Sequence, residues 1–407
     1  MKAETRITWL DYLLMYLLVG ISSMPFLIGD AYLVLGFVLT SVLMIVRKKT
    51  IDYGIVGYSL VYVLLIIGHV IFYEAFDLFI TIAFFLRIAY AYFTVKLLGS
   101  KITEVYLRTI VFLAIASLVV YALLVVYPPF WEILRFQIAP ALYGLNIHQD
   151  YYHIFIFTMN IGEGVLPRNP GAFWEPGGFG VFLNLALVLH LIQSKQITNK
   201  RSLLFIITVL TTQSTGSYIV LALIFMFYFY FIRRSIASLI VTPLLAATMI
   251  YAYETLPFMK VKFEKRSSKV DLDDTRFQAR TRLVAAMEDW KTFKESPLIG
   301  EGRFVKIEEV EKVGKQLARR SNGTSQYFAV FGLLGVIAYF GAMTRSMKKY
   351  CVAHGVSTIA AFISVIIIMV IGASQSIFFK PFFMAFSFFF LFNHTRRRML
   401  KKNLVQN

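Results

Sequence analysis

Long apolar runs alternate with short polar segments along almost the whole chain. An apolar run of roughly 20 residues is long enough to cross a bilayer as a helix, the usual element for such a crossing. The pattern predicts twelve spans, at about 9–28, 31–46, 54–73, 77–95, 108–127, 177–194, 202–214, 217–232, 236–252, 326–344, 354–373 and 376–393. We therefore expect an all-α polytopic membrane protein in which residues 1–407 form one membrane domain.

The composition excludes most other classes of protein. Hydrophobic residues make up 58% of the chain and charged residues only 16%, as expected for a protein surrounded by membrane lipid. The formal net charge of +18 does not indicate nucleic-acid binding, because Lys and Arg cluster at the ends of the apolar runs. The single cysteine, Cys351, excludes an intramolecular disulfide and a metal site built from several thiolates.

The basic clusters predict how the chain lies in the membrane. They all fall on one side of the twelve-span arrangement, and cytoplasmic segments are rich in Lys and Arg, so we expect both termini in the cytoplasm. The first apolar run contains Asp11 and has no cleavage pattern, which predicts a retained span. Two long loops, 128–176 and 253–325, then face outward and are expected to carry short helices.

The segment from Arg168 to Phe179 is the strongest candidate for chemistry. Its sequence, Arg-Asn-Pro-Gly-Ala-Phe-Trp-Glu-Pro-Gly-Gly-Phe, places a guanidinium and the Glu175 carboxylate seven positions apart, just before an apolar run. Three glycines and two prolines disfavour the interior of a helix and favour a stiff, turn-rich loop. The sequence therefore predicts a ligand-binding loop that presents Arg168, Trp174 and Glu175.

The second outer loop predicts an anion site. Asp273-Asp274 can cap a helix that runs to Ser296, because Leu283, Met287, Trp290 and Phe293 recur at helical spacing before Pro297. A helix N-terminus favours anions, and the arginines in the first turns of this helix favour phosphate; they are Arg276, Arg280 and Arg282. A second amphipathic segment, from Phe304 to Leu317, is expected along the membrane surface or over the cavity.

Four sequence blocks resemble the superfamily of O-antigen polymerases and O-antigen ligases. They appear in the order expected for that family and cover the chain from about 165 to 340. The blocks are Arg168 to Phe179, Thr211-Thr-Gln-Ser-Thr-Gly216, Arg282 with Trp290 and Pro297-Leu-Ile-Gly-Glu-Gly302, and Ser321-Asn322-Gly323 followed by Gly332-Leu-Leu-Gly335. No single block is specific for the family, but four blocks in the same order are. The predicted spans and the large outer loop also agree with this family.

This resemblance implies an enzyme that transfers lipid-linked sugars at the outer face of the bacterial inner membrane. Its donor and acceptor would be glycans on undecaprenyl pyrophosphate, a chain-length regulator protein is a possible partner, and neither a metal nor a nucleotide cofactor is implied. The outer-loop arginines that match the family's are Arg168 and Arg282, and they are expected to hold the pyrophosphate together with Arg280. Trp174 and Asn322 are expected to bind substrate as well.

One departure from the family bears on the reaction. Ligase-type members often have a histidine before the Asn that opens the span after the large loop, whereas this chain has Ser321 before Asn322. We therefore favour a polymerase over a ligase, and either over a flippase or exporter, because no internal repeat is visible. Glu175 is the candidate general base if its pKa is raised between Trp174 and Phe179; the alternative is a structural ion pair with Arg168.

Several other polar and aromatic residues have two possible roles each. Arg87 lies inside a span and needs an anionic partner, for which Glu74 or Asp77 is expected, or else a second pyrophosphate contact. His148 and His153 could supply a base, but packing or surface roles are more typical. Asp271, Asp273 and Asp274 could bind a divalent ion, although capping is the more typical role. Trp131, Trp174 and Tyr143 are candidates for stacking on sugar rings.

Overall fold

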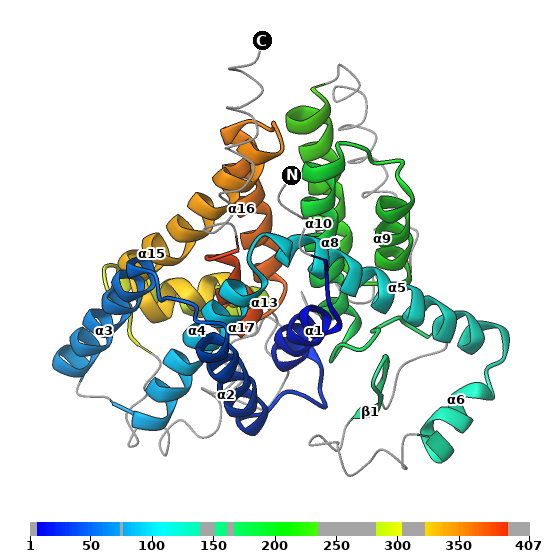
Figure 1. Cartoon of the computed structure of the whole chain (residues 1–407), viewed down its shortest axis with the longest axis horizontal. Coiled ribbons are helices and arrows are strands. Elements are labelled where there is room, and N and C mark those ends of the chain that lie inside the picture. The colour runs from blue at the N-terminus through cyan, green and yellow to red at the C-terminus, as the bar shows by residue number, and fades with distance from the viewer. Residues whose placement is uncertain are drawn as a thin grey trace.

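The computed structural model describes residues 6–73, 76–138, 151–160, 167–234, 282–302 and 322–389. The first half of the chain is a run of apolar helices joined by short turns (Figure 1). These are α1 (Trp9–Ser23), α2 (Asp30–Val46), α3 (Tyr53–Tyr73), α4 (Leu78–Leu98), the short 3-10 helix η1 (Gly99–Lys101) and α5 (Ile102–Val126). The connections are short, and α2 packs chiefly on α4.

The first predicted outer loop contains a β-hairpin in addition to short helices. After α6 (Phe130–Glu132) and the π-helical turn η2 (Ile133–Ile138), β1 (Tyr151–Ile154) pairs antiparallel with β2 (Phe157–Asn160). The loop therefore carries the expected short helices and, in addition, a hairpin that the sequence pattern did not predict. Tertiary contact stabilises the hairpin, because the Thr158 amide donates to the Gly171 carbonyl oxygen at 2.7 Å.

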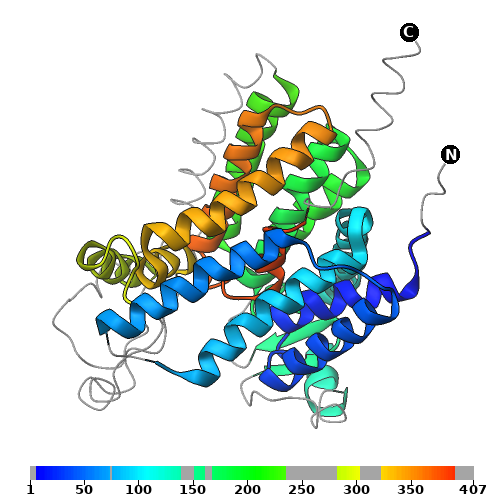
Figure 2. The same cartoon turned by 60° about the vertical axis from the view of Figure 1, so that its left-hand side comes forward.

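The second half of the described chain is also mostly helical (Figure 2). Its helices are α8 (Pro176–Ser194), α9 (Lys200–Thr211), α10 (Thr215–Phe227) with its π-helical continuation η4 (Tyr228–Arg233), α13 (Arg282–Glu295), α15 (Gly323–Ala353), α16 (Thr358–Ala373) and α17 (Pro381–Phe386). Helix α8 is buried along nearly its whole length, as expected for a helix that is apolar on every face. It forms the centre of the fold, so the segment that precedes it lies centrally at one end.

The described residues form an all-α membrane protein apart from the one hairpin. Fewer than the twelve predicted spans are established in them. Five helical segments are long and apolar enough to cross a bilayer, namely Tyr53–Tyr73, Leu78–Val126, Pro176–Ser194, Thr215–Arg233 and Gly323–Ala353. The long segment comprises α4, η1 and α5. Three shorter apolar helices are Trp9–Ser23, Asp30–Val46 and Thr358–Ala373. The predicted span at 236–252 lies outside the described residues.

The predicted span at 376–393 is wrong at its start. Residues 374–380 form turns, and α17 begins only at Pro381, in the first helical position that proline tolerates. These turns pack closely on α15, because a side chain at Gly323 would come within 3.0 Å of the Ile377 amide nitrogen. Non-helical backbone at this depth is tolerated where protein surrounds it.

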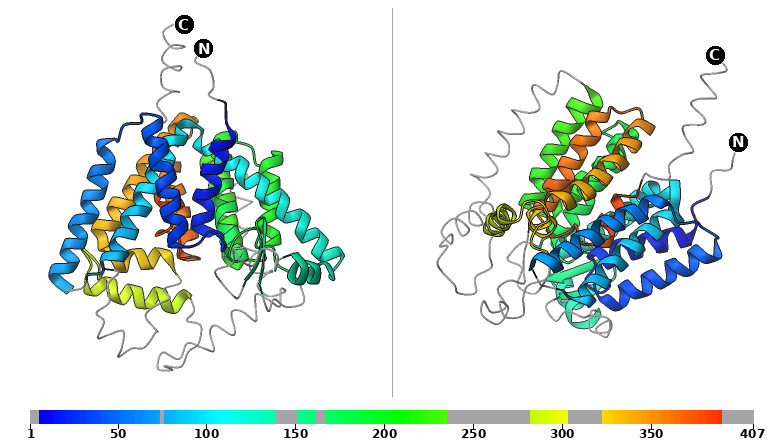
Figure 3. Two further views of the ribbon diagram at one scale, coloured as in Figure 1. Left: turned by 60° about the horizontal axis from the view of Figure 1, so that its bottom comes forward. Right: turned by 90° about the vertical axis from the view of Figure 1, so that its left-hand side faces the viewer.

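The two ends of the helices carry different features. In the left view of Figure 3, the α2–α3, α4–α5, α8–α9 and α15–α16 connections lie at one end, while α13 and the β-hairpin lie at the other. The connections hold basic residues and are tied together by polar contacts. Lys101 pairs with Asp11 at 2.6 Å, and the Lys195 ammonium donates to the Gly355 carbonyl oxygen at 3.3 Å.

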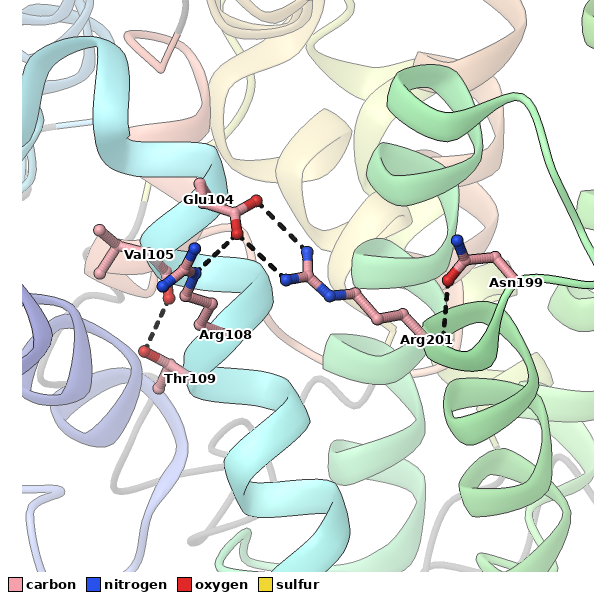
Figure 4. A network of polar contacts seen from close by, with 6 residues as sticks. All are labelled: Glu104, Val105, Arg108, Thr109, Asn199 and Arg201. Carbon is pink, nitrogen blue, oxygen red and sulfur yellow. Dashed lines mark hydrogen bonds and ion pairs between the residues drawn. The ribbon is translucent and has the colours of Figure 1, made fainter. Parts of the chain in front are cut away.

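A three-residue ion cluster joins α5 to α9 at this basic end. Figure 4 shows the Glu104 carboxylate between two guanidiniums, with Arg108 at 2.7 Å on the same helix and Arg201 at 3.2 Å on α9. Asn199 begins α9 by accepting a hydrogen bond from the Arg201 amide at 3.0 Å. The cluster therefore fixes how these two helices meet, at the end opposite to the candidate chemistry.

Helix α15 breaks at Gly332, and the break is filled by the Pro297–Gly302 loop. The amides of Leu333 and Leu334 donate to the carbonyls of Pro297 and Leu298, at 2.8 and 3.0 Å. In return, the amides of Glu301 and Gly302 donate to Ala329 and Val330 at 2.9 and 3.0 Å.

Glycine is required where these two backbones cross. Gly332 has φ +56° and Gly300 has φ +72°, and a side chain at either would come within 2.5 Å of the other segment's backbone. Two of the sequence blocks quoted above therefore form a single structural unit.

Candidate functional site

The loop before α8 is held rigidly by Asn169. Its side chain is fully buried, accepts from the Gly171 amide at 3.0 Å, and donates to Thr211 Oγ1 at 2.9 Å and Ser117 Oγ at 3.2 Å. Gly171 has φ +52°, a conformation that glycine adopts at little cost, and Phe173 stacks on Phe179. Sequence reasoning missed this role of Asn169, because its partners lie 42 and 52 residues away.

Arg168 binds the turn between α9 and α10. Its Nη2 donates to the Gln213 carbonyl oxygen at 3.2 Å, and the Gln213 side chain donates back to the Pro167 carbonyl at 3.3 Å. Gln213 has φ +47°, and its carbonyl faces the loop before α8. The predicted ion pair between Arg168 and Glu175 is wrong, because in the described part of the chain the ion partner of Glu175 comes from another helix.

That partner is Arg282, the first described residue of α13. Arg282 Nη2 lies 3.2 Å from Glu175 Oε1, and both side chains are about one-third exposed, at 34% and 37%. Gln375, from the turn after α16, donates its side-chain amide to the same Glu175 oxygen. Glu175 also precedes Pro176 at the N-terminus of α8, where the helix dipole favours a negative charge.

Gly177 shows how tightly these segments converge. A side chain at this position would come within 2.9 Å of the Gln375 amide nitrogen, 3.2 Å of Glu175 Oε1 and 3.4 Å of Ser214 Oγ. Ser214 follows Gln213, the residue that holds Arg168. The start of α8, the α9–α10 turn, the turn after α16 and the start of α13 therefore meet at one point.

Helix α13 reaches this cluster through Arg282 and contacts α15 through Asp289. Asp289 and Ala285 are buried, whereas Met287 and Trp290 are about half exposed. The apolar stripe of the sequence correctly predicts the helix, which ends at Glu295 just before Pro297, but its members Met287 and Trp290 do not lie on the buried face. The proposed cap at Asp273-Asp274, the arginines Arg276 and Arg280, and the segment 304–317 lie outside the described residues.

A cavity of about 240 Å³ lies between α13, α15 and α16. Its lining residues are Asp289, Trp290, Asn322, Thr324, Ser325, Phe328 and Ala373. Asn322 caps α15 through Oδ1, which accepts from the amides of Thr324 and Ser325 at 3.1 and 3.0 Å. The Ser325 hydroxyl donates to Asp289 Oδ2 at 2.6 Å. The structure thus places Asn322 at a cavity wall.

Other predicted residues lie elsewhere. Arg87 pairs with Asp30 at 3.6 Å and not with Asp77, which caps α4 by accepting from the Ile80 amide; Glu74 lies outside the described residues. The partner comes from α2 because α2 and α4 pack together. His69 on α3 contacts the Ile299 carbonyl through Nε2 at 2.7 Å and supports the loop that fills the α15 break.

The candidate histidines and aromatic residues of the first outer loop have packing roles where they are described. His153 is buried in β1 and lies 3.1 Å from Thr158 Oγ1. Trp131 packs on a small apolar cluster around α5 and the hairpin, and Trp174 packs over Gly178. His148 and Tyr143 lie outside the described residues.

The comparisons with known proteins bear on the second half of the chain. A search of curated proteins finds no match. Residues 202–340 match the family model described as O-antigen ligase, a region that includes the α9–α10 turn, α13, the Pro297–Gly302 loop and the first part of α15. This match confirms, over residues 202–340, the resemblance to O-antigen polymerases and ligases seen in the sequence, and it supports a membrane enzyme of polysaccharide assembly.

Proposed function

We propose that this protein is a membrane glycosyltransferase that joins undecaprenyl-pyrophosphate-linked repeat units into a surface polysaccharide at the outer face of the bacterial inner membrane. The observation that carries the proposal is the Glu175–Arg282–Gln375 cluster beside a cavity, at the end of the helices opposite the basic connections. A donor pyrophosphate would bind at Arg168 and Arg282, and Arg280, which lies outside the described residues, is expected to bind it too.

In this reaction the acceptor hydroxyl oxygen attacks the donor anomeric carbon as the bond from that carbon to the pyrophosphate oxygen breaks. Undecaprenyl pyrophosphate leaves, the configuration at the carbon inverts, and the hydroxyl proton passes to Glu175 or to the leaving pyrophosphate. Negative charge grows on the leaving group, and guanidiniums that are already in place stabilise that charge without a metal ion.

The contacts of Glu175 support two roles. As an anion held by Arg282 and Gln375, it orients the guanidinium that would bind pyrophosphate. As a partly exposed carboxylate, it also remains accessible to an acceptor hydroxyl. The first role explains the observed hydrogen bonds directly, and the second is the general-base hypothesis.

A ligase is the second candidate function, since the matched family model is described as O-antigen ligase. A polymerase is favoured by Ser321, which stands where ligase-type members often have histidine. A flippase or exporter of the same lipid-linked glycan is the candidate from a different class.

One reconstitution separates these functions. The purified protein is incorporated into liposomes with lipid-linked repeat units and no nucleotide sugar, and the products are resolved by gel electrophoresis. A polymerase yields a ladder of longer glycans and releases undecaprenyl pyrophosphate. A ligase yields product only when a different acceptor is added, and a flippase moves the lipid across the bilayer without releasing pyrophosphate. The last result would contradict the proposal.

A further inference from the structure

The cavity between α13, α15 and α16 combines hydrogen-bonding groups with apolar walls. Asp289 is only 2% exposed, and its carboxyl side chain is part of the cavity lining. Asn322 is 9% exposed; its oxygen caps α15, and its amide nitrogen has no hydrogen-bond partner among the described residues. The apolar walls come from Trp290, Phe328 and Ala373.

Arg282 and Asp289 lie on the same face of α13. Seven residues make nearly two helical turns, so the two side chains are separated by about 10 Å along the axis. Arg282 points to Glu175 at the start of α8, while Asp289 points to Ser325 on α15. One helix face therefore offers a positive group at one end and a negative group at the other.

This polarity selects among possible occupants of the cavity. A phosphate is disfavoured because the described lining contains the acidic residue Asp289 and no cationic side chain. A polyprenyl chain fits the apolar walls but cannot bond to the Asn322 amide, and burying an unpaired polar group is costly. A sugar ring satisfies both, because its C–H face packs on apolar walls while its hydroxyls donate to a carboxylate and accept from an amide.

We infer that this cavity is a saccharide subsite, in which Asp289 and Asn322 bind the hydroxyls of one sugar ring of the glycan substrate. The inference rests on the proposed function and extends it, since it separates a pyrophosphate position at Arg282 from a sugar position at Asp289. The volume of about 240 Å³ is small, so we expect one ring inside the cavity and the rest of the glycan outside it.

The test is direct binding of a sugar that carries neither lipid nor phosphate. Repeat-unit oligosaccharide cleaved from the cell's own surface polysaccharide is added to the full-length protein in nanodiscs, and saturation-transfer NMR measures Kd. Asp289→Asn keeps an acceptor for Ser325 but removes the charge, so Kd should rise about 10- to 100-fold, as expected for a lost charged hydrogen bond. Asn322→Asp keeps the cap of α15 but removes the amide donor, and it should weaken binding as well.

The matched control is Glu288→Gln, which makes the same change in charge at the neighbouring, exposed position of α13. It should leave Kd unchanged. Equal Kd values for the wild type, Asp289→Asn and Asn322→Asp would overturn the inference, as would the absence of binding to the wild type. Displacement of bound oligosaccharide by undecaprenyl phosphate would also overturn it, because the cavity would then hold the lipid.

The chain-growth assay keeps this inference distinct from the proposed function. If the wild type extends chains but binds no free oligosaccharide, the saccharide subsite is contradicted and the polymerase function is supported. If the protein makes no polymer but binds oligosaccharide in a way that depends on Asp289, the subsite is supported and the polymerase function is contradicted.

Discussion

Arg282 donates a hydrogen bond to the Glu175 carboxylate over 3.2 Å, although 107 residues separate them in the chain. The contact joins the first described turn of α13 to the N-terminus of α8, a helix that is buried along nearly its whole length. Gln375 binds the same carboxylate oxygen from a third segment. A change at any of these residues is therefore expected to act on the other two.

Arg282→Lys should reduce the rate of chain growth about 100- to 1000-fold, and Arg168→Lys should act similarly. Lysine keeps the positive charge but lacks the planar fork that binds a phosphate through two hydrogen bonds, and losing one donor of this kind costs about 3 to 4 kcal/mol of barrier. The rate is measured in liposomes containing lipid-linked repeat units. Arg108→Lys, at the opposite end of the molecule, is the control and should be near normal. Near-normal rates for both test variants would remove the pyrophosphate clamp from the proposal.

Glu175→Gln should distinguish the two roles of this carboxylate. If Glu175 is the general base, turnover at saturating donor should fall about 100- to 10,000-fold while donor affinity changes little. If Glu175 only orients Arg282, donor affinity should fall and turnover at saturating donor should persist. Binding and single-turnover rate are measured separately. Unchanged values for both would leave the pyrophosphate itself as the proton acceptor.

A saturating chelator should leave the rate of chain growth unchanged in the purified system. The reason is that arginine guanidiniums supply the positive charge that a divalent ion supplies in other transferases. The rate is compared before and after chelation, with each divalent ion added back in turn. A rate that falls and recovers with one ion would shift attention to Asp271, Asp273 and Asp274, which lie outside the described residues.

Gly300→Ala and Gly332→Ala should each destabilise the protein by at least about 1 to 2 kcal/mol. That figure is the cost of left-handed backbone for a residue with a Cβ, and contact with the opposing backbone adds to it. Thermal unfolding in detergent measures the effect. Gly341→Ala is the control within the same helix, because a side chain there would meet no atom within 4 Å. It should be neutral or slightly stabilising. Equal melting temperatures for all three variants would mean that the two backbone segments can move apart without a measurable loss of stability.

The sequence by itself determined the class of the protein and most of its helices. Apolar runs at helical length predicted α3, α8 and α16 to within a few residues, and Pro297 marked the end of α13, because helix formation and burial in a bilayer depend on local composition. The ordered motif blocks also indicated the superfamily that the match over residues 202–340 confirms.

Only the tertiary structure decided which residues meet. Glu175 binds Arg282 and not Arg168, Arg87 binds Asp30 and not Asp77, and α13 turns Asp289 inward while Trp290 stays half exposed. These outcomes depend on how helices far apart in the chain pack against one another, and local periodicity carries no information about that packing. The same holds for Gly300 and Gly332, whose need for glycine is set by the crossing of two backbones.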